Sequence, residues 1–180
     1  MIRIGILSDT HLHAPDDRFR QALERAFPDV ALILHAGDLT DITILDGFAG
    51  KELIAVHGNM CVTDTRTRLP AQRTVHIAGW TIGLTHGNGP GMGIEERVMD
   101  LFPQADCIVF GHSHRPLCRR YGARLLVNPG SFGSGSASSA TCAIMEIDSA
   151  AIRVEIRSAA DTPDAPPLTS CRLTRQTPSV

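Results

Sequence analysis

The first sixty residues alternate short apolar runs with amphipathic stretches, and this alternation limits the folds open to the chain. Three runs have the length and β-branched content of buried strands: residues 2–7, 30–34 and 52–56. Between the first two, Phe19, Leu23 and Phe27 fall on one face of a predicted helix that Pro28 ends. A second amphipathic helix is expected over 42–49. Strands and helices in this order predict parallel βαβ units, whose strands end at one edge of a sheet.

The rest of the chain has the pattern of antiparallel structure. Residues 74–78 and 81–85 flank a Gly-Trp turn and predict a β-hairpin, and 94–102 predict a helix. A final hairpin, expected on a second sheet, is predicted for 141–147 and 151–156. The Gly/Ser-rich loop 133–139 is expected to be mobile. We therefore expect one α/β domain over 1–157, and a loosely ordered Pro/Ser/Thr-rich tail over 158–180.

Composition excludes several classes of protein. A chain of 180 residues supports one sizeable core, and a net charge of −2 gives no basic surface for bulk nucleic-acid binding. No apolar run has the length of a membrane span, and the N-terminus has the pattern of a strand rather than of a signal peptide. The five cysteines are scattered without a Cys-x-x-Cys pair. This argues against a disulfide framework and favours a cytoplasmic location.

Polar side chains follow the predicted strands at the point where each strand ends. Because the ligand site of a parallel sheet lies beyond the carboxyl ends of its strands, we expect these side chains to meet. They are carboxylates, imidazoles and one amide: Asp9, His11, Asp38, Asn59, His86, His112 and His114. Nitrogen and oxygen donors without thiolate favour Mn, Fe, Co, Ni or Zn over a structural zinc site. The pattern predicts a site for two divalent metal ions.

The motifs that carry these residues resemble a known family. Ser-Asp-Thr-His, His-Ala-Gly-Asp, Gly-Asn, Thr-His-Gly, Gly-His-Ser-His and Asn-Pro-Gly-Ser occur in this order between residues 8 and 131. They resemble the calcineurin-like metallophosphoesterases, and in particular the small bacterial and archaeal phosphodiesterases, over residues 2–157. The resemblance implies a four-layer α/β/β/α sandwich of two mixed β-sheets flanked by helices.

The resemblance also implies a ligand set and a reaction. The first metal would be held by Asp9, His11, Asp38 and His114. The second would be held by Asp38, Asn59, His86 and His112, with Asp38 as the bridge. Manganese ranks first among the ions, with Fe, Ni, Co and Zn as alternatives. A hydroxide between the two ions would attack the phosphorus of a small phosphodiester in line with the leaving group. Asp38, Asn59 and His86 are the residues we expect to be catalytic.

One departure from the family bears on the leaving group. Many relatives have a histidine after Gly-Asn that is proposed to protonate it, and the small subfamily commonly has Cys-Asp there, whereas this chain has Met60-Cys61. Methionine cannot transfer a proton, so aryl esters should be hydrolysed well and alkyl esters poorly. Asn88 and Arg115 are the candidates for substrate contacts. A loop asparagine beside Gly89 is more often explained by turn chemistry, and a solvated surface residue explains Arg115 at least as well.

Two other functions compete with a phosphodiesterase. A phosphomonoesterase would use the same site with a different pocket. A scaffold is the third reading, because one eukaryotic branch that resembles this fold, a retromer subunit, serves mainly as a protein-binding platform and has lost part of the ligand set. All seven ligand positions are filled here, which favours the enzyme. The sequence leaves the oligomeric state open, including a homo-oligomer.

Overall fold

The computed structural model describes residues 1–48, 50–133, 140–161 and 164–175. The helices are α1 (Asp17–Ala26), the 3-10 helix η1 (Ile42–Phe48), α2 (Thr63–Arg68) and α3 (Ile94–Leu101). The strands up to the middle of the chain are β1 (Ile2–Leu7), β2 (Leu32–His35), β3 (Glu52–Ala55), β4 (Gln72–Ile77), β5 (Trp80–Thr85) and β6 (Cys107–Val109). The later strands are β7 (Leu117–Tyr121), β8 (Arg124–Asn128), β9 (Thr141–Ile147), β10 (Ala151–Ser158) and β11 (Thr169–Thr174).

The strands form two mixed sheets. One has six strands in the order β11-β10-β9-β1-β2-β3, and the other has five in the order β4-β5-β6-β8-β7. Strands β1, β2 and β3 are parallel, as the βαβ pattern predicts. The hairpin β9-β10 forms at the predicted residues, but the prediction that it lies on a second sheet is wrong. Strand β9 pairs antiparallel with β1, so the hairpin extends the first sheet.

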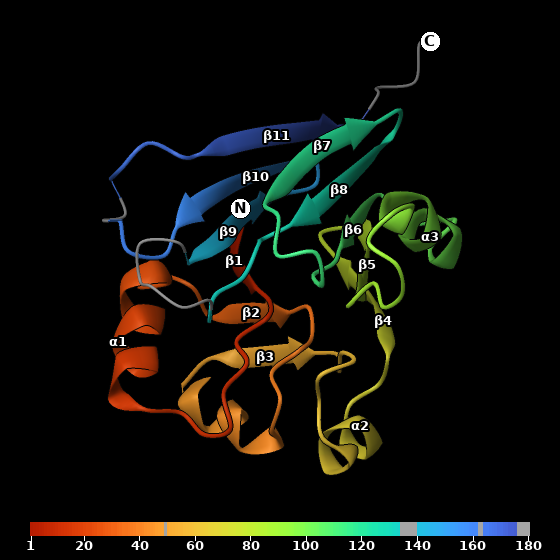
Figure 1. Cartoon of the computed structure of the whole chain (residues 1–180). Helices are drawn as coiled ribbons and strands as arrows, with labels where there is room; N and C mark the ends of the chain where they lie inside the picture. The colour runs from red at the N-terminus through yellow and green to blue at the C-terminus, as the bar shows by residue number, and fades with distance from the viewer. Residues whose placement is uncertain (49, 134–139, 162–163, 176–180) are drawn as a thin grey trace, which may run out of the picture.

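The layers follow from the alternation of side chains along each strand. On β1 and β2, Ile6 and Leu34 point into the core between the two sheets, whereas Leu7 and Ile33 pack under α1 and η1. On the second sheet, Ile108 packs with α3 on the outer face. Helices α1 and α3 thus lie on opposite sides of the paired sheets (Figure 1). The predicted four-layer α/β/β/α sandwich is confirmed.

The two helices predicted between β1, β2 and β3 are present, but the second is not an α-helix. Helix α1 begins where the Asp16 carboxylate accepts a hydrogen bond from the Phe19 N–H at 2.8 Å, which caps its first turn. The second predicted helix is the 3-10 helix η1, which still buries Ile44 and Phe48. Gly47 near the end of this segment disfavours a regular α-helix, and short segments of this kind often take the 3-10 form. Position 49 and most of the Gly/Ser loop, 134–139, lie outside the described residues.

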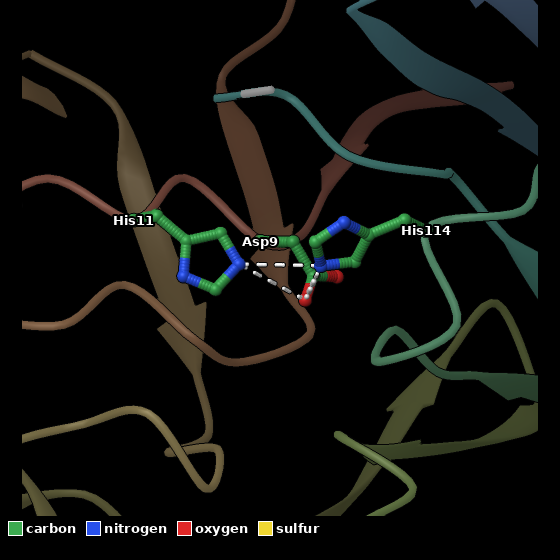
Figure 2. Close-up of side chains that lie close together, drawn as sticks. All are labelled: Asp9, His11 and His114. Atoms are coloured by element: carbon green, nitrogen blue, oxygen red, sulfur yellow. Dashed lines mark hydrogen bonds and ion pairs between the residues drawn. The ribbon is translucent and has the colours of Figure 1, made fainter. Parts of the chain in front are cut away.

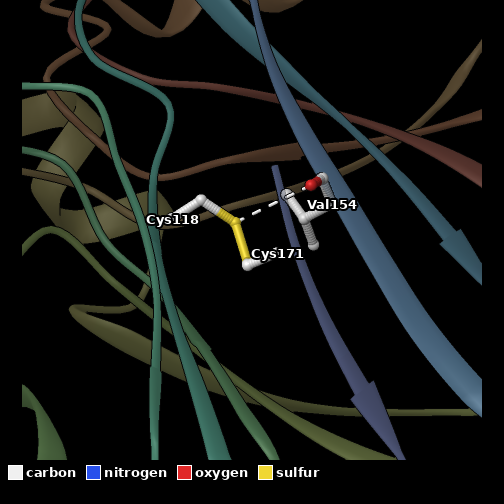
Figure 3. The surroundings of a disulfide bond; sticks show 3 residues. All are labelled: Cys118, Val154 and Cys171. Carbon is white, nitrogen blue, oxygen red and sulfur yellow. Dashed lines mark hydrogen bonds between the residues drawn. A yellow bond between two sulfur atoms is a disulfide. The ribbon is translucent and has the colours of Figure 1, made fainter. Parts of the chain in front are cut away.

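The tail and the cysteines correct two expectations. Strand β11 pairs antiparallel with all but the end of β10, so Thr169–Thr174 belongs to the domain rather than to a loose tail. Its apolar residue Leu173 is buried in the core, a signal too weak to stand out from the sequence around it. Cys171 forms a disulfide with Cys118 of β7 and so joins the two sheets (Figure 3). Cys118 Sγ also lies 3.7 Å from the carbonyl oxygen of Val154.

No helix in the described ranges is both long and apolar enough to span a bilayer.

Candidate metal centre

The strand ends that carry the predicted ligands meet at one edge of the sandwich. Asp9 and His11 follow β1, Asp38 follows β2, and His86 follows β5. His112 and His114 follow β6, which is parallel to β5. Both sheets therefore contribute predicted ligands, and the candidate site lies where the carboxyl ends of their strands meet.

One group of side chains converges on the Asp9 carboxylate. The side chain of Asp9 is fully buried, and its Oδ1 lies 3.0 Å from His114 Nε2 and 3.7 Å from His11 Nε2. Figure 2 shows the carboxylate between the two imidazole rings, which approach it from opposite sides. The two Nε2 atoms are 3.2 Å apart. These three residues could hold one metal ion.

A second, fully buried group shares Asp9 and adds Asp38 and His86. His86 Nδ1 donates a hydrogen bond to the Ala36 carbonyl at 2.8 Å, so a neutral His86 presents a lone pair at Nε2. The Nε2 atom lies 3.0 Å from Asp38 Oδ2 and 3.9 Å from Asp9 Oδ1. Among the described residues, His86 Nε2 and Asp9 Oδ1 are buried without a hydrogen-bond partner. Facing acceptors of this kind need a proton or a cation between them, so the residues present fit a metal ion.

The other predicted site residues lie around this group. His112 packs against His86 with ring centroids 5.2 Å apart, and its Nε2 donates to the Gly89 carbonyl, which leaves Nδ1 as its free nitrogen. Asn59 is exposed, and its carbonyl accepts a hydrogen bond from Arg66. The next residue, Met60, donates its N–H to Asp38 Oδ1 at 2.7 Å. The structure thus brings the Gly-Asn loop to the site through backbone contacts.

The two candidates for substrate contacts are both exposed. Asn88 lies in the loop after His86, and Arg115 follows His114 directly. Arg115 lines a pocket beside the site together with Ser113.

The backbone of the ligands is itself unusual. Seven described residues other than glycine have a positive φ, and five of them are predicted ligands, with φ between 50° and 68°: Asp9, His11, Asp38, His112 and His114. Such conformations cost about 1–3 kcal/mol each and persist where the surrounding structure enforces them. Their clustering here indicates a functional site.

Two glycines allow the strand-end loops to approach so closely. A Cβ on Gly111 would collide with Ser8 Oγ and lie 2.7 Å from Asp9 Oδ2. A Cβ on Gly58 would collide with Asp38 Oδ1 and lie 2.6 Å from His86 Cδ2. Each of the two motif glycines therefore leaves room for a ligand that another loop supplies.

The charges of the site favour ionised carboxylates. Burial alone would raise the pKa of Asp9, but His11, His86 and His114 outweigh it and lower that pKa. Burial likewise opposes ionisation of Asp38, yet its contact with His86 lowers the pKa of this carboxyl. Burial would lower the pKa of His86, but Asp38 and Asp9 raise it overall. A metal ion would therefore compete with protons for this site.

Three buried polar residues hold the loops in place, and for His35 the sequence already favours hydrogen bonding at a strand end over metal binding. His35 Nδ1 accepts a hydrogen bond from the Gly37 N–H, so the ring proton is on Nε2. This Nε2–H donates to Thr10 Oγ1 at 3.2 Å and links the Asp9 loop to the Asp38 loop. Asn128 donates to the Gly111 carbonyl at 2.7 Å, and Ser131 donates to the Asp9 carbonyl at 2.9 Å. The Asn-Pro-Gly-Ser motif was the available signal for the last two, and it gives them a structural role.

Comparisons with known proteins identify the family of this chain. The family model described as the calcineurin-like phosphoesterase superfamily domain matches residues 2–150. A protein named probable metallophosphoesterase from Methanothermobacter thermautotrophicus is 34% identical over 158 residues, which cover 85% of this chain and 90% of that protein. A protein named phosphodiesterase from Methanocaldococcus jannaschii is 25% identical over 147 residues, covering 72% of this chain and 83% of its own.

The fold comparison gives the same result. The crystal structure of Vps29 from Chaetomium thermophilum superposes with a TM-score of 0.74, at 20% identity, over 98% of this chain and all of that one. At this identity the likeness concerns the fold alone. The family model and the archaeal relatives settle the family: this chain belongs to the calcineurin-like phosphoesterase superfamily.

Proposed function

We propose that this protein is a phosphodiesterase that uses two divalent metal ions, with Mn²⁺ ranked first. The observation that supports it most is the pair of orphaned buried atoms, Asp9 Oδ1 and His86 Nε2, which face other acceptors at the junction of the two sheets. A fold kept only for its surface would have no reason to retain such costly groups. The phosphodiesterase from Methanocaldococcus jannaschii supports the choice of a diester substrate by similarity.

The chain's own residues hold and orient the ligand set. Asp9, His11 and His114 would bind the first ion, and Asp38, Asn59, His86 and His112 the second. The resemblance gives the bridging role to Asp38, whereas the two groups of close donors share Asp9. When bound, the ions supply positive charge that neutralises the phosphate oxygens and promotes ionisation of water. The Ala36 and Gly89 carbonyls fix the tautomers of His86 and His112.

In this proposal, water adds to phosphorus and the bond to the leaving alcohol breaks, without a covalent bond to the protein. The alcohol departs without help from position 60, because Met60 holds no proton to give.

The location in the cytoplasm remains a prediction from the sequence. The Cys118–Cys171 disulfide argues against it unless reductants cannot reach the bond.

The test is hydrolysis of bis(p-nitrophenyl) phosphate by chelator-stripped protein before and after Mn²⁺ is restored. We expect turnover only with the metal, and its loss in Asp38→Asn, which keeps the size of the side chain. The monoester p-nitrophenyl phosphate, measured in parallel, should react more slowly. Faster turnover of the monoester would favour a phosphomonoesterase. A folded protein that binds Mn²⁺ and hydrolyses neither ester would favour a scaffold.

A further inference from the structure

A pocket of about 610 Å³ lies directly beside the candidate metal centre. Two segments supply most of the lining. One contributes Ser113, Arg115, Pro116 and Leu117, and the other contributes Gly91, Met92, Ile94 and Glu95. Ser113 lies between the ligands His112 and His114, so the pocket and the metal site share this segment. The volume is in the range of sites for drug-sized ligands.

The lining combines an apolar floor with polar groups. Ile94 and Phe110 are almost fully buried, and they line the pocket together with Pro116 and Leu117. Met92, which is 90% exposed, also lines the pocket. An apolar floor of this kind suits a planar ring, one face of which can lie on it.

The polar groups of the pocket differ in how far they are already paired. Glu95 accepts a hydrogen bond from the Tyr121 hydroxyl at 2.5 Å and lies 3.6 Å from Arg119, so its charge is offset. Within the described ranges, the Arg115 guanidinium has no hydrogen-bond or ion-pair partner. A guanidinium can stack on a planar ring or donate hydrogen bonds to its edge. The Ser113 hydroxyl is a further polar group in the lining.

We propose that this pocket binds the nucleoside part of a phosphodiester substrate, with the base on the apolar floor and beside Arg115. The inference rests on the proposed function, because the phosphate must sit at the metal centre. A short alkyl ester would leave most of the space empty. A lipid chain would fill it but would make no contact that uses the Arg115 guanidinium.

Gly91 offers a way to block the pocket without disturbing the fold. A Cβ there would meet no atom within 4 Å, and Gly91 is not among the glycines with positive φ. Gly91→Leu therefore adds a large side chain at a lining residue of the pocket without backbone strain. Arg115→Ala removes the unpaired cation. Arg120→Ala is the matched control, because Arg120 is exposed on β7 and donates to the Gly122 carbonyl outside the pocket.

The experiment measures binding of two phosphates to the Mn²⁺-loaded protein by titration calorimetry. Thymidine 5′-phosphate and 2-deoxyribose 5-phosphate differ only in the base. We expect the nucleotide to bind about tenfold more tightly or better, since stacking of a base is worth this much. Gly91→Leu should bring the ratio close to one, Arg115→Ala should reduce it, and Arg120→Ala should leave it unchanged.

Other outcomes overturn the proposal. Equal affinity for the two phosphates in the unaltered protein, or an unchanged ratio in Gly91→Leu, would show that the pocket does not bind the base. Tighter binding of octyl phosphate than of the nucleotide would assign the pocket to a lipid chain. Failure of every phosphate to bind would contradict the phosphate site itself, and with it both the proposed function and this inference.

Discussion

His35 should make the stability of the metal-free protein depend on pH in a way that can be isolated. Its side chain is fully buried, and burial lowers its pKa to about 4 from an ordinary value of 6.5. The unfolded chain therefore binds more protons than the folded one between these values. Stability from this group is fully present above pH 6.5 and is lost as the pH falls toward 4. At about 1.4 kcal/mol per pKa unit, the loss is roughly 3 kcal/mol.

The perturbation is His35→Phe, which fills the space but removes both ring nitrogens. At pH 7 it should destabilise the protein by about 2–6 kcal/mol, since the Thr10 hydroxyl and the Gly37 N–H are left buried without a partner. The variant cannot lose the His35 contribution on acidification, so its deficit relative to the unaltered protein should shrink by roughly 3 kcal/mol toward pH 4.

Urea denaturation followed by circular dichroism, with a chelator present, measures this deficit at pH 7 and at pH 4.5. Ionisation of Asp9 and Asp38 affects both proteins and largely cancels in the difference. His76→Gln is the control, because His76 is exposed on β4. A deficit that stays constant or grows between the two pH values would refute the burial argument.

Three further predictions follow from the packing of the site and of the sheets. Gly111→Ala should weaken Mn²⁺ binding in calorimetry and lower the free energy of unfolding by about 1–3 kcal/mol, because its Cβ would displace Ser8 and Asp9. Unaltered Mn²⁺ binding would contradict the close approach of these loops. Cys171→Ser removes the disulfide, which closes a loop of sequence separation 53, and should lower the free energy of unfolding in urea by about 4 kcal/mol. The difference between the two proteins should vanish when both are measured in reductant. Met60→His should raise the rate of hydrolysis of alkyl diesters by up to about 10²–10⁴-fold and change that of p-nitrophenyl esters little. Equal effects on both kinds of ester would exclude a role of position 60 in protonating the leaving group.

The sequence predicted the fold wherever side-chain periodicity was strong. The runs that became β1, β2 and β3 and the stripe of α1 were sufficient for the parallel half of the first sheet. Helix α2 (Thr-Asp-Thr-Arg-Thr-Arg) has no apolar stripe and gave no signal. Strand β11 was missed because it is short, mostly exposed and pairs with a neighbour that only the tertiary structure supplies. The sheet joined by β9 depends on a pairing with β1 more than a hundred residues away.

The candidate site was predictable to a similar extent. The residues that carry the family motifs lie at the ends of strands, as expected. The pairing of Cys118 with Cys171 was not, since it depends on how the two sheets face each other. The pocket beside the metal centre had no motif, because its lining comes from two segments whose contact the sequence does not reveal.

The central claim is that the cluster around Asp9 binds two divalent ions, and direct titration of Mn²⁺ into chelator-stripped protein tests it. The account predicts two ions per chain. In Asp9→Asn, affinity should fall by more than the roughly 10–100-fold that loss of an outer partner costs, since Asp9 belongs to both groups of donors. Absence of binding, or two ions bound as tightly in Asp9→Asn as in the unaltered protein, would contradict the account.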